Sequence, residues 1–138
     1  MMIRTILIDF KRTLYDPETH QLYQDWEAIF ELRKFGIEVW LWSRDEFSGT
    51  ERKLRKKIKE KFDKAIISNE KNLDLVRKPM ESCILSDHRI DIEMAQKVGA
   101  KTIWIRRGKY KDTWPKNEPD FLVYSLYEAV EKIKGFMV

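Results

Sequence analysis

The sequence predicts an α/β protein in which a parallel β-sheet lies between two layers of helices. Short apolar runs alternate along the chain with longer segments whose apolar residues recur at helical spacing. The runs carry few polar residues, as expected for strands buried on both faces of a parallel sheet. Several runs stop at a polar residue, which places polar side chains at the edge where open α/β sheets bind ligands.

The first strand carries the side chain around which the rest of the chain is organised. Ile3, Ile6 and Ile8 belong to an apolar run that stops at Asp9, so Asp9 is expected at the mouth of the crevice. An aspartate after a strand is alternatively no more than a turn or helix cap. Residues 13–24 contain an Asp-Pro pair and alternating apolar residues, which are typical of a short hairpin hanging over the crevice.

A helix and a second strand follow the hairpin. Asp25 is expected to be the N-cap of this helix and Gly36 its C-terminal stop. Residues 37–42 then form a buried strand that ends at Ser43. The remaining predicted elements are a basic helix at 51–61, a strand at 62–68, a brief helix carrying Leu73, Leu75 and Val76 and closed by Pro79, a strand at 82–86, a helix from Ile92 to Gly99, strands at 101–105 and 121–123, and a helix at 126–134.

The composition is that of a globular protein with a heavily ionised surface. A chain of 138 residues suits one domain, residues 1–138, and its 43% apolar content with 12% aromatic residues excludes a disordered chain. The first apolar run is interrupted by Asp9 and Lys11, which excludes a signal peptide or a membrane span. The single cysteine, Cys83, lies in an apolar run and is expected to be a buried, reduced thiol. These features predict a cytoplasmic protein.

The net charge of +4 is small, but the basic residues are unevenly distributed. They concentrate in residues 52–61, which begin at Arg52 and end at Lys61. Leu54 and Ile58 are four residues apart, which fits an amphipathic helix with a solvated basic face; a polyanion-binding face is the alternative. A basic, aromatic loop either binds nucleic acid or packs against the edge of the sheet; it contains Trp104, Arg106, Arg107, Tyr110, Lys111 and Trp114.

Polar groups at the ends of three predicted strands form a candidate site. Asp9 and Ser43 end two of them, and Asp87 with Asp91 follows a third. Asp87 and Asp91 are four residues apart and share one side of a helix if the turn opens one. Three carboxylates at one crevice repel one another unless a cation lies between them, and oxygen ligands select a hard ion such as Mg²⁺. Helix capping is the alternative role of Asp87 and Asp91.

The spacing of these residues matches a set of known motifs. The first motif is an apolar strand ending in Asp-x-Asp-x-Thr, matched in part by residues 9–13, and the second is a strand ending in Ser or Thr, matched by Ser43. The third is a lone lysine, matched by Lys71 or alternatively Lys78. The fourth is Asp-x-x-x-Asp after an apolar strand, matched by Asp87 and Asp91, with Ala95 and Gly99 in the helix that follows. In these motifs the chain resembles the haloacid dehalogenase-like (HAD) superfamily, most of whose members are phosphohydrolases. The resemblance implies a Rossmann-like, three-layer HAD-like fold without a cap domain.

The resemblance also implies a role for each matched residue. Asp9 would attack a phosphoryl group and form an aspartyl-phosphate. The implied Mg²⁺ site comprises Asp9, Asp87, the main-chain carbonyl of Lys11 and Asp91, and Asp91 would fix a metal-bound water or Lys71. Three side chains would hold the phosphoryl oxygens, those of Ser43, Arg44 and Lys71. Thr13 would position the turn. The substrate would be a phosphorylated small molecule or macromolecule. A crevice without a cap is open, which suits an extended substrate; alternatively, a second copy of the chain closes the crevice in a homo-oligomer.

Lys11 departs from the motif, which usually carries a second aspartate at this position. That aspartate protonates the leaving oxygen and later activates water, whereas a lysine is ordinarily protonated at neutral pH and is a poor general base. Arg12 adds further charge where a small glycine is frequent. The sequence therefore predicts a phosphohydrolase with altered activity or, alternatively, an inactive binding or regulatory module in which Lys11 replaces the metal and a basic surface meets a nucleic acid or other polyanion.

Overall fold

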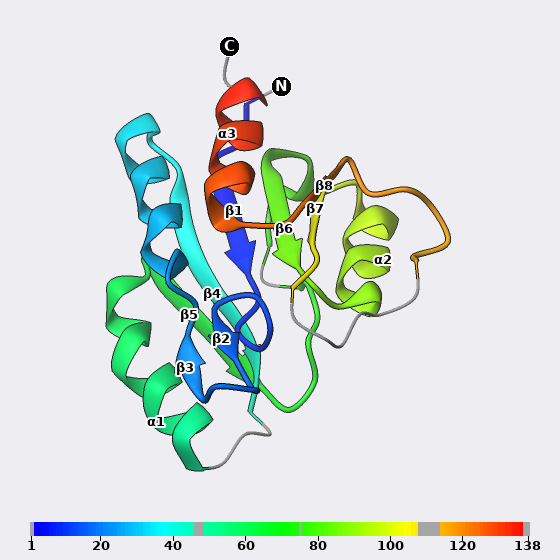
Figure 1. Cartoon of the computed structure of the whole chain (residues 1–138). Helices are drawn as coiled ribbons and strands as arrows, with labels where there is room; N and C mark the ends of the chain where they lie inside the picture. Colours follow the sequence, from blue (N-terminus) through cyan, green and yellow to red (C-terminus); the bar gives the residue numbers. More distant parts are fainter. Residues whose placement is uncertain (1, 46–48, 75, 108–113, 137–138) are drawn as a thin grey trace.

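Six strands form one parallel sheet in the computed structural model of the chain, which describes residues 2–45, 49–74, 76–107 and 114–136. The strand order is β5-β4-β1-β6-β7-β8, with β1 near the centre (Figure 1). All five neighbouring pairs are parallel, so the carboxyl ends of the strands lie at the same edge. This agrees with the predicted fold class.

The helices and strands have the following bounds. The strands are β1 (Thr5–Ile8), β2 (Tyr15–Asp16), β3 (Gln21–Leu22), β4 (Glu38–Arg44), β5 (Lys64–Ser68), β6 (Ser82–Ser86), β7 (Lys101–Ile105) and β8 (Phe121–Val123). The α-helices are α1 (Gly49–Ile58), α2 (Arg89–Val98) and α3 (Leu126–Phe136), and the 3-10 helices are η1 (Trp26–Phe35), η2 (Lys59–Lys61) and η3 (Pro79–Glu81).

Alternation along the strands divides the apolar side chains between two cores. On β1, Ile6 and Ile8 point into the core under η1, α1 and α3, whereas Leu7 points into the core under α2. The first core is the larger and includes Ile29 of η1 and Ile133 of α3. Each face of the sheet is therefore covered, which gives the predicted three-layer arrangement (Figure 1).

Most predicted elements are confirmed, and one predicted helix is wrong. Residues 15–22 form the expected hairpin, and Gly36 and Gly99 end their helices with positive φ angles, as glycine allows. The segment between Lys71 and Pro79 is not helical where it is described; Leu75 lies outside the described residues. The main-chain carbonyl of Asn72 accepts a hydrogen bond from Trp42 of β4, and Pro79 begins η3. The packing of this segment on β4 outweighs its helical spacing.

Asp25 precedes η1 as expected, but its side chain does not cap that helix. Both carboxylate oxygens lie 2.8 Å from the guanidinium of Arg107, and Oδ2 also accepts a hydrogen bond from the main-chain N–H of Leu126 at the start of α3. The Arg107 guanidinium lies 4.1 Å from the centre of the Tyr23 ring. Asp25 is therefore the buried partner of the buried Arg107 cation. Through these contacts it links three parts of the chain: the hairpin, the loop that follows β7, and the start of α3.

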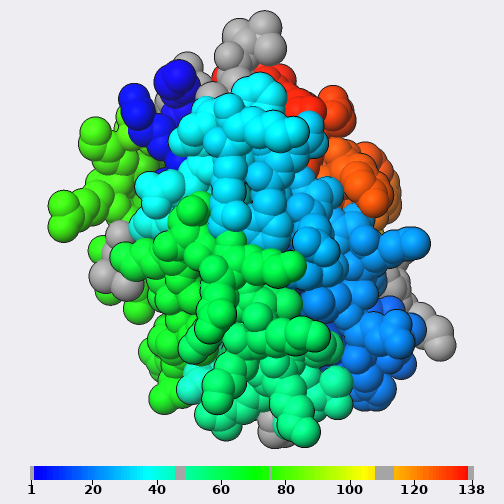
Figure 2. All heavy atoms as spheres, turned by 90° about the vertical axis from the view of Figure 1, so that its left-hand side faces the viewer, coloured from blue at the N-terminus to red at the C-terminus, as the bar shows by residue number. Residues whose placement is uncertain are grey.

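The basic helix predicted at 51–61 is α1 followed by η2, and it lies on the surface below η1 (Figure 2). Ile58 is buried and Leu54 packs against the first core, as the helical spacing indicates. Arg55 is an exception to the solvated basic face, since it is only 4% exposed.

The segments between β1 and β4 and between β4 and β6 contain no further domain within the described residues. The fold therefore agrees with the predicted architecture without a cap. None of the described helices is long and apolar enough to cross a membrane.

Candidate functional site

Asp9 lies where the central strand leaves the sheet. Ile8 is paired with Leu41 of β4 and Leu85 of β6, and the main-chain N–H of Asp9 donates to the carbonyl of Leu85 (3.0 Å). The hydrogen-bonded ladder therefore holds the backbone of Asp9 in place. Its side chain is only 11% exposed, so charged neighbours act on it with little screening by water.

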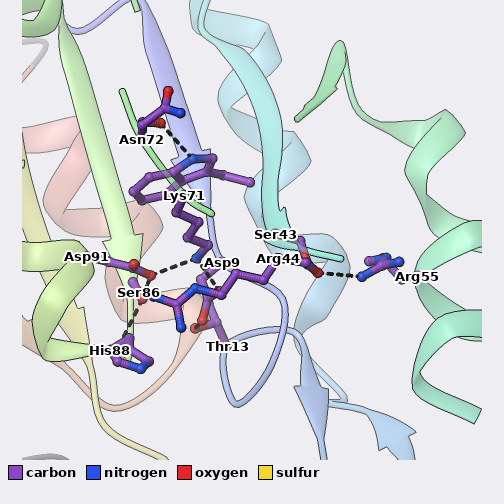
Figure 3. Close-up of polar contacts among 11 residues, drawn as sticks. Asp9, Thr13, Ser43, Arg44, Arg55, Lys71, Asn72, Ser86, His88 and Asp91 are labelled. Atoms are coloured by element: carbon purple, nitrogen blue, oxygen red, sulfur yellow. Dashed lines mark hydrogen bonds and ion pairs between the residues drawn. The ribbon is translucent and has the colours of Figure 1, made fainter. Parts of the chain in front are cut away.

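Lys71 supplies the positive charge beside Asp9. Its Nζ lies 2.6 Å from Oδ1 of Asp9 and 2.7 Å from Oδ2 of Asp91, as Figure 3 shows. Nζ also lies 4.4 Å from the centre of the Trp42 ring. Burial lowers the pKa of Lys71, but the attraction of Asp9 and Asp91 outweighs it and the pKa is raised overall. Lys71 is therefore a fixed ammonium that bridges two carboxylates.

Ser86 holds Asp91 from the other side. Its hydroxyl donates to Oδ2 of Asp91 (2.8 Å) and accepts a hydrogen bond from the main-chain N–H of His88 (3.0 Å). The second oxygen of Asp91, Oδ1, is buried and has no hydrogen-bond partner among the described residues. Sequence reasoning missed Ser86 and Trp42 as parts of this site. Ser86 ends β6 much as Ser43 approaches the end of β4, and that similarity could have indicated it.

Asp87 is the second carboxyl group beside Asp9. Burial first, and then the charge of Asp9 and a hydrogen bond to it, raises the pKa of Asp87 to about 9, although nearby Arg12 opposes the shift. At neutral pH Asp87 therefore keeps a proton with which it can donate to Asp9. A cation between the two carboxyl groups would replace that proton.

The turn after Asp9 is built by hydrogen bonds to one carbonyl. The carbonyl of Phe10 accepts main-chain hydrogen bonds from residues 13, 14 and 15, and Lys11 forms a backbone bridge with Tyr15. The Thr13 hydroxyl points at Oδ2 of Asp9 from 3.4 Å. Arg12 has a φ of 62°, the left-handed conformation that glycine adopts most easily, which explains why a glycine suits this position.

Ser43 and Arg44 reach the same edge from β4. The Ser43 hydroxyl donates to the carbonyl of Arg44 (3.0 Å) and not to the carboxylates. The Arg44 side chain extends from the strand toward Asp9 in Figure 3, and its guanidinium makes no hydrogen bond or ion pair with the described residues. Arg55 donates to the carbonyl of Arg44 (2.7 Å) and to Asp45 (2.9 Å), and so fixes the end of β4.

The structure brings together Asp9, Thr13, Lys71, Asp87 and Asp91, and it places Lys78 elsewhere. Lys78 lines a cavity at the opposite edge of the sheet and is largely exposed. The structure therefore places Lys71, and not Lys78, beside Asp9.

The basic, aromatic loop packs against the sheet where it is described. Trp104 is buried and donates to the main-chain carbonyl of Asp87 (3.1 Å), and Arg107 is held by Asp25. Arg106 lies 5.2 Å from the centre of the Trp104 ring and 5.5 Å from that of Trp114. Tyr110 and Lys111 lie outside the described residues.

The donor set can be compared with what a magnesium ion requires. No three acidic, histidine or cysteine side chains within the described ranges are placed to hold a metal ion together. Asp9 and Asp87, in contrast, form a carboxyl pair whose proton a cation could replace, and Asp91 Oδ1 is a buried acceptor without a partner. Two carboxylates and a main-chain carbonyl, with water in the other positions, suit Mg²⁺. The residues present therefore fit the ion.

Comparison with known families identifies the group to which the fold and the site belong. The model of the HAD-hydrolase-like family matches residues 54–129, more than half of the 138-residue chain. The chain belongs to the HAD-hydrolase-like family. The matched region contains Lys71, Asp87 and Asp91 of this HAD-like protein, whereas Asp9 and Ser43 precede it. Among curated proteins, no sequence matches significantly.

Solved structures similar to this HAD-like protein include different enzymes. A HAD phosphatase from Thermococcus onnurineus is 24% identical with a TM-score of 0.63, over 83% of this chain and 59% of its own. An L-2-haloacid dehalogenase from Xanthobacter autotrophicus is 12% identical with a TM-score of 0.73, over 97% and 99%. The Bacillus subtilis HAD-hydrolase YfnB, bound to magnesium, is 13% identical with a TM-score of 0.72, over 96% and 99%. At these identities the similarity shows the fold.

Proposed function

We propose that the protein is a phosphohydrolase that attacks a phosphomonoester with Asp9. The observation that carries this proposal is the position of Asp9, a largely buried carboxylate at the end of the central strand. One of its oxygens lies beside the Lys71 ammonium and the other faces the Thr13 hydroxyl. These contacts orient a nucleophile beside a buried positive charge.

The chemistry divides into two displacements. A carboxylate oxygen of Asp9 bonds to phosphorus, the bond from phosphorus to the ester oxygen breaks, and the leaving oxygen takes up a proton. Water then bonds to phosphorus and gives up a proton, the bond from phosphorus to the Asp9 oxygen breaks, and phosphate and the free Asp9 carboxylate result. The guanidinium of Arg44 and the ammonium of Lys71 face the phosphoryl charge, while Asp91 and Ser86 hold Lys71 in place.

Magnesium belongs to the proposal, because the family uses it and YfnB binds it. Asp9, Asp87 and the main-chain carbonyl of Lys11 would hold the ion. When bound, Mg²⁺ supplies positive charge that stabilises the phosphoryl oxygens. A cytoplasmic location is also proposed, supported by the free, buried Cys83 thiol.

Turnover of p-nitrophenyl phosphate with and without Mg²⁺ tests the proposal. Asp9→Asn should abolish turnover, because an amide cannot act as the nucleophile. Asp74→Asn, which alters an exposed aspartate whose side chain makes no hydrogen bond or ion pair with the described residues, should retain turnover. Turnover that survives Asp9→Asn, or no turnover of any phosphomonoester by the unmodified protein, would contradict the assignment.

The lysine at position 11 leads to a further prediction about this reaction. Because a lysine is ordinarily protonated at neutral pH, it can give a proton to the leaving oxygen but does not readily activate water. The first displacement should therefore outpace the second and produce a burst of p-nitrophenol equal to the enzyme concentration. Lys11→Asp should remove the burst and raise steady-state turnover about tenfold or more. A linear time course in both proteins would show that Lys11 does not limit hydrolysis.

A second candidate is a binding module for a nucleic acid or another polyanion. The specific observation is that basic side chains of α1 and η2 are exposed and make no ion pair with any described residue; they are Arg52, Lys53, Lys56, Lys57 and Lys59. Such a surface attracts phosphate backbones without a catalytic site. Its test is the salt dependence of binding, argued in the Discussion.

A further inference from the structure

A cavity lies at the edge of the sheet opposite Asp9. It has a volume of about 490 Å³, and its lining includes the first residues of β1, β4, β5 and β6. Sites for small organic molecules typically occupy roughly 300–1,000 Å³. Thr5 and Asp9 lie at opposite ends of β1, so this cavity is separate from the candidate active site.

The charge of the cavity is positive. Four basic residues line it but only two carboxylates, Glu38 and Glu81. Glu81 is already 3.5 Å from Arg4 and 4.0 Å from Lys78, and Glu38 accepts a hydrogen bond from the Trp40 indole (3.3 Å). The other two basic residues, Lys64 and Arg77, make no ion pair with the described residues. Their charges are therefore available to an anion.

One wall of the cavity is aromatic and apolar. Trp40 is partly buried and packs with Val76 against the core under α2, and both residues line the cavity. The Lys64 ammonium lies 4.7 Å from the centre of the Trp40 ring. An anionic group that meets Lys64 would therefore hold its carbon skeleton against the indole.

We propose that this cavity binds a small organic anion with an aromatic body. The body lies against Trp40 and Val76, and a phosphate or carboxylate group pairs with Lys64 and Arg77. The proposal does not depend on the reaction at Asp9, because the two sites occupy opposite edges of the sheet. Neither the fold nor the family motifs require cations at these positions.

Isothermal titration calorimetry with four probes tests the proposal. Adenosine 5′-monophosphate carries a ring and a phosphate, and 2-naphthoate carries a ring and a carboxylate. Adenosine and inorganic phosphate each lack one of the two features. At least one of the first two probes should bind, and adenosine and inorganic phosphate should each bind tenfold or more weakly than it. Whichever of the two binds identifies the anionic group. The absence of binding by both, or equal binding by adenosine or inorganic phosphate, would overturn the proposal.

Variants locate the bound probe. Lys64→Ala and Arg77→Ala change exposed side chains and should each weaken binding about tenfold without unfolding the protein. Lys53→Ala on α1 is the matched control and should bind like the unmodified protein. Arg44→Ala separates the two edges of the sheet. Loss of binding in Arg44→Ala with retention in Lys64→Ala would place the probe beside Asp9 and overturn the proposal, whatever the phosphatase assay shows.

Discussion

Lys71 carries a positive charge into a region where two carboxylates would otherwise face each other without compensation. Its side chain is 3% exposed, and those of Asp9 and Asp91 are 11% and 1% exposed. The ion pairs alone do not establish a large stabilisation, because burying three charged groups costs free energy of hydration. Removing one partner is different, since the remaining charges stay buried and lose their compensation.

Lys71→Met should therefore lower the free energy of unfolding by about 3–5 kcal/mol. Adding Asp91→Asn should recover part of this loss, because it removes one of the two stranded carboxylates. Urea denaturation of the single and double variants measures both effects. Lys78→Met, at an exposed site, is the matched control and should change stability by less than about 0.5 kcal/mol. Equal losses in Lys71→Met and Lys78→Met would rule out the bridging role.

The raised pKa of Asp87 leads to a prediction of how the stability of the metal-free protein depends on pH. Its pKa is raised to about 9 in the folded state, whereas an unfolded aspartate has a pKa of about 3.9. Between these values the folded protein binds a proton that the unfolded chain has released. The contribution of this proton is complete below about pH 4 and is lost as the pH rises through about 9.

Asp87→Asn removes this titration, so its stability relative to the unmodified protein should increase with pH, by at most about 1.4 kcal/mol per pH unit. Urea denaturation in EDTA between about pH 5 and about pH 8 gives the comparison. Mg²⁺ should bind the unmodified protein more tightly as the pH rises, because the ion replaces the proton. Parallel pH profiles for the two proteins would show that Asp87 does not hold a proton in the fold.

Among the elements, α1 is attached to the end of β4 through hydrogen bonds of Arg55. Arg55 is buried and donates to the carbonyl of Arg44 and to Asp45, so the helix fixes the strand end from which Arg44 projects. Arg55→Ala should lower the free energy of unfolding by about 2–3 kcal/mol, since hydrogen bonds from a charged donor are lost.

The same change should weaken substrate binding, because Arg44 would lose its fixed position; an increase in KM larger than any fall in kcat is expected. Lys56→Ala, on the exposed side of α1, should leave both the stability and KM unchanged. Chemical denaturation and steady-state kinetics measure the pair. An unchanged KM in a destabilised Arg55→Ala would assign Arg55 to stability alone.

Local patterns predicted the elements well where the pattern and the packing agree. Residues 82–86 and 101–105 are strands within the bounds that their apolar runs indicate. The helix expected before Pro79 failed, because Lys71 reaches Asp9 and the Asn72 carbonyl pairs with Trp42, contacts that only the folded sheet creates. The role of Asp25 was hidden for the same reason, since its partner Arg107 is 82 residues away.

For the molecule as a whole, the sequence indicated which carboxylates share one edge of the sheet, but not which positive charges lie beside them. Asp9 and Asp87 directly follow two strands, and the ends of parallel strands lie at the same edge of the sheet. The choice between Lys71 and Lys78 could not be made among 27 basic residues, because it depends on the path of an irregular segment. Ser43 shows the same limit, since the direction of its hydroxyl follows from the local geometry of the strand end.

The distribution of charge over the molecule leads to a final prediction. The net charge is only +4, yet α1 and η2 present several basic side chains on one surface without acidic partners among the described residues. If this surface meets a nucleic acid, each phosphate contact releases condensed counterions, and the affinity falls steeply as salt increases. Three contacts predict a loss of affinity of more than about tenfold when the salt concentration increases fourfold.

Fluorescence anisotropy with labelled duplex DNA and single-stranded RNA measures this dependence. The double variant Lys53→Glu with Lys57→Glu reverses two charges on one side of α1 and should abolish binding, because the surface would then repel phosphates. Lys97→Glu reverses an exposed charge on α2 and should bind almost as before. Binding that ignores salt, or that Lys97→Glu weakens as much as the α1 variant, would show that α1 is only a solvated helix, and the binding-module alternative would lose its specific observation.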